Sequence, residues 1–143
     1  MASINFFSEK IRFKLKDPKK TISWIKSVIK KEGATLTSLN YIFCSDEYLK
    51  EVNIQYLNHK SYTDIITFNY NPSEKELDGE IYISVDRVRE NAETFKTDFK
   101  PELNRVIIHG VLHLIGFNDK TKTEKSIMRE KEDSYLSLLN NSK

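Results

Sequence analysis

The sequence predicts a single domain of the α+β class, close to an α/β layer, with four strands and five helices. Its 143 residues suffice for one domain with a buried core. Strand-like and helix-like patterns of apolar residues alternate along residues 4–85, whereas the residues that follow show helical spacing only. We therefore expect one folding unit over residues 1–143, with its helices concentrated toward the C-terminal end.

The first strand and the first helix are predicted from an alternating pattern and a helix start signal. Apolar and charged side chains alternate over residues 4–15, most clearly at 11–16, which is typical of a strand with one solvated face. Asp17 followed by Pro18 then suits an N-cap and a first helical position. We expect this helix to stop at Gly33.

Three further strands and a second helix are predicted before residue 86. Residues 35–44 have the composition of a strand, and the helix that follows them ends near Leu57. A polar loop at 58–62 leads to two more strand-like segments, at 63–70 and 80–85. A hairpin is one arrangement for these last two segments, although the connection between them is long.

Three helices are predicted in the C-terminal part of the chain. Their start signals are Asp86 as an N-cap, Pro101 as the residue that opens the middle helix, and Thr121 with Glu124 at the capping-box spacing. The first of the three reaches about Phe95 and the last reaches about Leu139. Apolar residues surround most of the middle helix, which predicts that it lies in the core.

The overall composition indicates an ordinary soluble protein. Charged residues make up 31% of the chain, and no apolar run approaches the length of about 18 residues that a membrane helix needs. The first ten residues lack the basic-then-apolar order of a secretory peptide, so we expect a cytoplasmic protein without a membrane partner. The single cysteine, Cys44, excludes an internal disulfide.

Positive charge is concentrated at the N-terminal end. Residues 1–31 carry nine Lys or Arg against two acidic residues, a local net charge of +7 that leaves −5 for the rest of the chain. A solvated lysine-rich face is the simpler interpretation. Next to a metal site, the same charge suits a polyanionic substrate such as a nucleic acid. The candidate RNA-binding residues are Arg12, Lys14, Lys19 and Lys20.

A candidate metal site lies on the middle C-terminal helix. His109 and His113 are four residues apart, which places both imidazoles on one face of a helix. Gly116 can end that helix in a left-handed conformation, so that the chain turns back and brings Asp119 to the same ion. Three protein ligands with a fourth position open are typical of catalytic zinc. Two hydrogen-bonded core histidines are the alternative interpretation.

The spacing matches the metzincin pattern of zinc peptidases except at two positions. Gly110 stands where those enzymes carry their catalytic glutamate, and Asp119 stands where they carry a third histidine. Loss of the glutamate argues against peptide hydrolysis, whereas a carboxylate is an acceptable zinc ligand. Gly110 also costs about 1 kcal/mol relative to alanine in a helix, which predicts that another backbone or a substrate comes close to it.

Three segments together resemble the YbeY family, single-domain bacterial endoribonucleases also described as rRNA maturation factors. They are residues 109–117, residues 53–56 followed by 63–68, and residues 79–84, in the family's order. The resemblance implies a mixed sheet of about four strands packed on helices and one zinc ion held by His109, His113 and Asp119. It also implies cleavage of single-stranded RNA, maturation of the 3′ end of small-subunit rRNA, and ribosome quality control.

Two positions depart from the family's usual pattern. Asp119 replaces a third histidine, and Leu57 stands where an arginine is usual, so His59 or Lys60 would have to take over the role of that arginine. A water molecule activated by zinc and the ribose 2′-hydroxyl are the two possible nucleophiles, and the sequence does not choose between them. Asp64, Glu80 and His59 are the candidate catalytic side chains, and RNA, as rRNA or the small ribosomal subunit, is the expected partner.

Three functional hypotheses follow from these features. The first is a zinc-dependent endoribonuclease, in which nickel, cobalt or iron could replace zinc because the ligand types admit them. The second is a ribosome-assembly or RNA-binding factor without catalysis, whose metal is structural. The third is another metallohydrolase, including a peptidase, and Gly110 makes it the weakest of the three.

Overall fold

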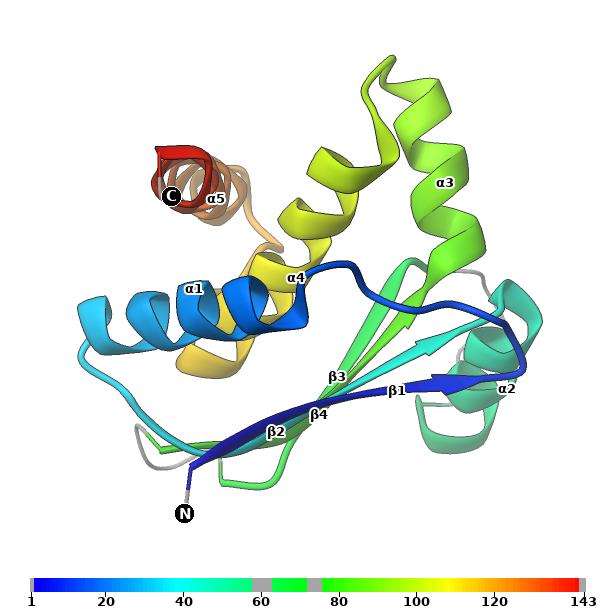
Figure 1. Cartoon of the computed structure of the whole chain (residues 1–143), viewed down its shortest axis with the longest axis horizontal. Helices are drawn as coiled ribbons and strands as arrows, with labels where there is room; N and C mark the ends of the chain where they lie inside the picture. Colours follow the sequence, from blue (N-terminus) through cyan, green and yellow to red (C-terminus); the bar gives the residue numbers. More distant parts are fainter. Residues whose placement is uncertain (1, 58–62, 72–75, 142–143) are drawn as a thin grey trace.

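The computed structural model describes residues 2–57, 63–71 and 76–141. Within these residues the chain forms four strands and five helices, as the sequence predicted (Figure 1). Their order and bounds are β1 (Ser3–Glu9), α1 (Pro18–Lys31), β2 (Thr35–Cys44), α2 (Asp46–Leu57), β3 (Ile65–Asn69), β4 (Glu76–Ser84), α3 (Val85–Thr94), α4 (Phe99–Ile115) and α5 (Lys122–Asn141). None of the helices in these residues is long and apolar enough to span a bilayer.

The four strands make one mixed sheet in the order β1-β2-β4-β3. β1 and β4 both run parallel to β2, with Tyr41 of β2 opposite Phe6 on one side and Ile81 on the other. β3 pairs antiparallel with β4, so the hairpin between the last two predicted strands is present. A long helical connection from β1 to β2 is what a parallel pair requires.

The helices cover the two faces of the sheet unequally. α1, α4 and α5 lie on one face, where their apolar side chains form the main core with β1, β2 and β4, and α3 extends this layer at one end (Figure 1). α2 lies on the other face and packs on a smaller cluster that includes Cys44 and Ile66. The single cysteine is therefore buried and free.

α4 runs through the main core directly above the sheet. A methyl group at Gly110 would lie 2.9 Å from Cδ1 of Ile81 and 3.1 Å from Cδ1 of Ile65. The close approach predicted for this glycine is real, but side chains of the sheet make it, rather than another backbone or a substrate. Gly110 thus lets the helix that carries both histidines lie close to β3 and β4.

The first strand is shorter than predicted. β1 ends at Glu9, and the segment 11–16, which shows the clearest alternation, lies outside the sheet. Positive φ angles at Lys10 (59°) and Asp17 (52°) turn the chain at both ends of this segment. Its apolar side chains pack against the main core while its charged side chains remain exposed. An extended chain that crosses the edge of a core gives the same period of two as a strand.

Two predicted helix starts also change. Ser84 caps α3, because its hydroxyl accepts a hydrogen bond from the Arg87 backbone N–H at 3.0 Å. Asp86 instead accepts one from the Asp46 backbone N–H at 3.0 Å. α4 begins at Phe99, two residues before Pro101. Tertiary hydrogen bonds, which single-chain signals do not reveal, account for the shift at α3.

The other predicted boundaries hold to within a few residues, with two qualifications. Asp17 precedes α1 as predicted, but its side chain makes no capping hydrogen bond. The capping box before α5 is present, with Thr121 Oγ1 accepting from the Glu124 N–H at 3.1 Å and Glu124 Oε1 accepting from the Thr121 N–H at 2.9 Å. The predicted loop 58–62 lies outside the described residues.

Candidate functional site

An open cleft of about 820 Å³ lies beside α4. α4 forms one wall, α5 forms a second, and the segment 63–67 at the start of β3 contributes to a third. The side chains of His109, His113 and Asp119 all line this cleft. The three predicted metal ligands therefore line the same cleft.

The cleft side of α4 is a polar stripe on an otherwise buried helix. The stripe consists of Glu102, Arg105, His109 and His113, which are spaced by three, four and four residues. That spacing keeps side chains on one face of an α-helix. The remaining sides of α4 are buried in the main core, so the helix cannot turn its stripe away without exposing that core.

His109 is held between two carboxylates. Its Nε2 lies 3.4 Å from Oδ2 of Asp119, and its Nδ1 lies 2.7 Å from Oε2 of Glu132 on α5. We assign the ring proton to Nδ1, which then donates to Glu132 and leaves the Nε2 lone pair facing the cleft. A histidine ligand whose other ring nitrogen donates to a carboxylate is the usual arrangement at protein metal sites.

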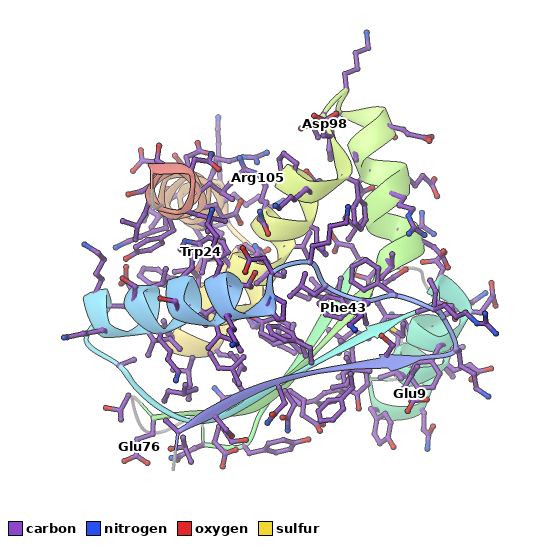
Figure 2. All side chains as sticks on the ribbon, in the orientation of Figure 1. Glu9, Trp24, Phe43, Glu76, Asp98 and Arg105 are labelled. Atoms are coloured by element: carbon purple, nitrogen blue, oxygen red, sulfur yellow. The ribbon has the colours of Figure 1, made fainter. Side chains whose placement is uncertain are left out.

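Glu132 is in turn fixed by Arg105. The Arg105 guanidinium donates to Oε1 of Glu132 at 2.9 Å and to Oδ1 of Asp133 at 2.7 Å, reaching from α4 toward α5 (Figure 2). The Glu132 side chain is only 8% exposed, so its charge depends on these partners. Two hydrogen bonds from two different residues hold both of its oxygens in place.

Glu132 was not among the residues predicted from the sequence, although the sequence carries a signal for it. Met128, Tyr135 and Leu139 lie on the buried side of α5 at helical spacing, and Glu132 occupies the same side. A carboxylate within an apolar stripe is rarely buried unless it has a partner. Such a residue is a candidate for a buried hydrogen bond even before its partner is known.

The His109 and Glu132 pair perturbs the pKa of both residues. Burial disfavours the charged imidazole, but the hydrogen bond and charge of Glu132, with the charge of Asp119, outweigh it and raise the pKa of His109. Burial would likewise raise the pKa of Glu132, but its hydrogen bonds to His109 and Arg105 lower it. Glu132 therefore stays ionised, as a carboxylate acceptor for the Nδ1 proton must.

Two further carboxyl groups line the cleft and are harder to ionise. Burial raises the pKa of Asp64, although the positive charge of His109 acts against the shift. Burial also raises the pKa of Glu102, opposed by Arg105. The Asp64 carbonyl accepts a hydrogen bond from the Ser84 N–H at 2.9 Å, which fixes the backbone at that point. Asp64, a candidate from the sequence, therefore does lie in the cleft.

The other candidate catalytic residues are not in the described walls of the cleft. Glu80 lies in the middle of β4, on the opposite face of the sheet from α4, where it accepts a hydrogen bond from the Tyr70 hydroxyl at 2.7 Å. It was expected at a strand end because β4 was expected to begin there, but β4 begins four residues earlier. His59 and Lys60 lie outside the described residues. Leu57 is 42% exposed at the end of α2.

The chemistry of the cleft fits a divalent metal ion, although no ready-made ligand cage is present. No group of three or more His, Cys, Asp or Glu side chains is arranged to hold a metal within the described ranges of the chain. The donors that line the cleft are two imidazoles and a carboxylate, which suit zinc. The cleft also carries four acidic and three basic side chains, and a bound cation would neutralise the excess negative charge.

The predicted RNA-binding residues do not lie in the cleft walls. Arg12, Lys14, Lys19 and Lys20 are all exposed, before α1 and in its first turn. Lys20 alone among them lines a hollow, a smaller one of about 240 Å³ between α1, α4 and α5. This second hollow shares Pro101 and Leu136 with the cleft, so the two adjoin.

Comparisons with known proteins agree with the fold and with the resemblance. The model of the family described as "Endoribonuclease YbeY" matches residues 3–140. A protein of that name from Amoebophilus asiaticus is 50% identical, covering 94% of this chain and 92% of its own, and one from Flavobacterium psychrophilum is 48% identical, covering 92% and 94%. The solution structure of TM1509 from Thermotoga maritima has a TM-score of 0.67 at 30% identity, covering 96% and 89%.

Proposed function

The chain belongs to the YbeY endoribonuclease family, and from that premise we propose that it is a zinc-dependent endoribonuclease that cuts single-stranded RNA. We further propose that it acts in the cytoplasm on rRNA, at the 3′ end of the small-subunit rRNA, and in ribosome quality control. The observation that supports a catalytic cleft best is the His109 ring, which is oriented by the buried Glu132 carboxylate and faces the cleft with Nε2.

His109, His113 and Asp119 are the residues that would hold the zinc ion. When bound there, zinc supplies Lewis-acid chemistry and positive charge for the phosphodiester. Glu132 keeps the proton on His109 Nδ1, so that the lone pair of Nε2 remains available to bind the metal. Arg105 holds Glu132 ionised and immobile, which means that the histidine does not have to reorient during the reaction.

Asp64 and Glu102 are the candidates for proton transfer. Both carboxyl groups line the cleft, and burial raises the pKa of each. A carboxyl group with a raised pKa is better matched to proton transfer near neutral pH than an ordinary one. We assign Asp64 the leading role, because it lines the cleft together with His109 and was already a candidate from the sequence.

Cations on α5 are placed to bind the phosphate that is cut. Lys125 and Arg129 line the cleft from the first half of α5. Arg129 is 62% exposed and lies 3.9 Å from Glu132, so its guanidinium remains accessible to a ligand. These two side chains can supply the positive charge that Leu57 does not, and we propose that they take the role expected of the family's arginine.

Cleavage of RNA by the purified protein tests this proposal. Wild-type protein supplied with zinc should cut a labelled single-stranded RNA, and should leave a fully paired duplex of the same sequence intact. His113→Ala should not cut, and Lys96→Ala, an exposed residue outside the cleft, should cut like wild type. Equal cleavage by His113→Ala and wild type would point to a contaminating nuclease and contradict the proposal. RNA binding without cleavage would favour a ribosome-assembly factor with a structural metal.

The rRNA part of the proposal needs a separate measurement. Purified wild-type protein should shorten precursor small-subunit rRNA within ribosomal particles toward its mature 3′ end, as read by mapping of RNA ends. His113→Ala should leave the precursor end unchanged. Cleavage of free RNA together with an unchanged precursor end would support the nuclease activity but contradict the proposed rRNA substrate.

A further inference from the structure

Residues of α1, α4 and α5 line the second hollow, which adjoins the cleft. These three helices lie together on one face of the sheet (Figure 1). The first turns of α1 and α4 both open onto it, through Lys20 and Lys100. The N-terminal end of a helix carries partial positive charge and free backbone N–H groups, which favour an anion. Lysines in a first turn are unfavourable there unless an anion compensates them.

Positive charge in the second hollow is not neutralised by neighbouring residues. Lys16, Lys20 and Lys100 line it, against one acidic residue, Asp17. Across the part of the chain that the structure describes, none of the three ammonium groups has an ion pair or a hydrogen bond. The cleft differs, since its Arg105 is held by two carboxylates. The second hollow therefore has positive charge available for a ligand.

Asn104 gives independent support for a ligand in this hollow. It lines the hollow from α4, the residue is only 8% exposed, and its carboxamide has no hydrogen-bond partner among the described residues. No side-chain polar atom of the described residues is both fully buried and without a partner, so the Asn104 amide reaches water inside the hollow. An amide that is carried by a largely buried side chain and opens onto a hollow can hydrogen-bond to a ligand there.

The position of the second hollow connects it to the proposed reaction. Pro101 and Leu136 belong to the walls of both hollows, so a strand lying in the cleft can continue into the second one. The cleft carries four acidic against three basic side chains, whereas the second hollow carries three basic side chains against one acidic. The second hollow is therefore the more positive of the two and the better place to hold the RNA backbone without metal.

We propose that the second hollow is a subsite for a backbone phosphate of the RNA strand, beside the point of cleavage. Lys16, Lys20 and Lys100 neutralise the phosphate, and the Asn104 carboxamide donates to one of its oxygens or to the neighbouring ribose. The proposal rests on the proposed function, because it assigns part of the substrate of the same site. It also separates Lys20 from Arg12, Lys14 and Lys19, which do not line the hollow.

Binding of RNA without metal tests the subsite apart from catalysis. A fluorescein-labelled single-stranded RNA is titrated with protein in the presence of a chelator, and anisotropy gives the Kd at several salt concentrations. Lys20→Ala/Lys100→Ala should weaken binding roughly 10-fold and reduce the salt dependence by about 0.7 per lost contact. Lys26→Ala/Lys30→Ala removes the same charge from exposed positions of α1 that line neither hollow, and should bind like wild type.

Asn104→Leu separates a ligand contact from a structural one. If Asn104 serves a ligand, the variant should bind RNA several-fold more weakly while its Tm stays close to the wild-type value, because the amide makes no hydrogen bond within the described residues that leucine would remove. A lower Tm with unchanged RNA affinity would assign Asn104 to the fold and contradict its role in the subsite.

The outcomes also distinguish this proposal from the nuclease assignment. Weaker binding by Lys20→Ala/Lys100→Ala than by Lys26→Ala/Lys30→Ala supports the subsite, even if the wild type cuts no RNA. Equal affinity of the two double variants overturns the subsite, even if the wild type cuts RNA in a zinc-dependent way.

Discussion

The cleft and the second hollow share two wall residues but differ in whether their polar side chains have hydrogen-bond partners. In the cleft, His109, Arg105 and Glu132 hold one another through hydrogen bonds of 2.7 to 2.9 Å. In the second hollow, Asn104 and three lysines have no partner within the described residues. Groups that perform chemistry benefit from being fixed in advance, whereas groups that bind a flexible polyanion can be satisfied by the ligand itself.

Removal of the metal should separate the two regions most strongly. Chelation should reduce cleavage of single-stranded RNA to the level of a buffer control, because the Lewis acid is lost from the cleft. RNA affinity should change little, because the second hollow needs no metal. Gel assays of cleavage and anisotropy measurements of binding, made on the same chelated sample, check both parts. Parallel loss of cleavage and binding would contradict the division of roles.

Glu132→Gln should damage the cleft alone. Loss of the carboxylate beside His109 should weaken zinc affinity by about 10- to 100-fold, measured by competition with a chelating dye. RNA affinity without metal should not change. Asp133→Asn is the matched control, because Asp133 shares Arg105 with Glu132 but does not contact the histidine. A similar loss of zinc affinity in both variants would mean that the position of Arg105, rather than the hydrogen bond between Glu132 and His109, determines zinc affinity.

The same contrast explains what the sequence could predict. The spacing of His109, His113 and Asp119 is local, so helix geometry and a glycine turn were enough to expect them in one place. Glu132 reaches His109 across 23 residues, and only its place in an apolar stripe hinted at a partner. Binding of zinc by the three residues stays a prediction.

The second hollow was beyond the reach of sequence patterns for a physical reason. Lys20, Lys100 and Asn104 come together only when α1 packs beside α4, which depends on tertiary contacts. The exposure of the two lysines, the burial of Asn104 and the missing partners of all three therefore could not be predicted from the sequence, in which Lys14, Lys19 and Lys20 looked equivalent. The prediction of a strand at 11–16 was wrong for a related reason. Side chains of an extended segment can alternate between buried and exposed without the segment pairing with a strand.

Gly110→Ala should disturb both hollows together, since α4 forms a wall of each. The new methyl group would crowd Ile81 and Ile65, which typically costs 1–3 kcal/mol, and the better helix propensity of alanine returns about 1 kcal/mol. A net destabilisation of about 0–2 kcal/mol is expected from urea unfolding, together with weaker zinc and RNA binding. An equally stable variant would show that the isoleucine side chains move aside without cost.

Thr121→Ala should give the smallest effect and should reach only the cleft. The capping box of Thr121 and Glu124 anchors the chain directly after Asp119. Its loss should cost about 1 kcal/mol of stability and modestly weaken zinc binding, while RNA affinity without metal stays at the wild-type value. Thr123→Ala, in the same helix but outside the capping box, serves as the control, and urea unfolding with dye competition measures both variants. Equal behaviour of the two variants would contradict this role for the capping box.

Calorimetric titration with zinc tests most directly whether the cleft is a metal site. Wild-type protein should bind one ion per chain, and His109→Ala, His113→Ala and Asp119→Ala should each lose that binding while retaining the wild-type circular dichroism spectrum. Undiminished binding of zinc by folded His113→Ala and Asp119→Ala would contradict the account, because the ion would then lie elsewhere.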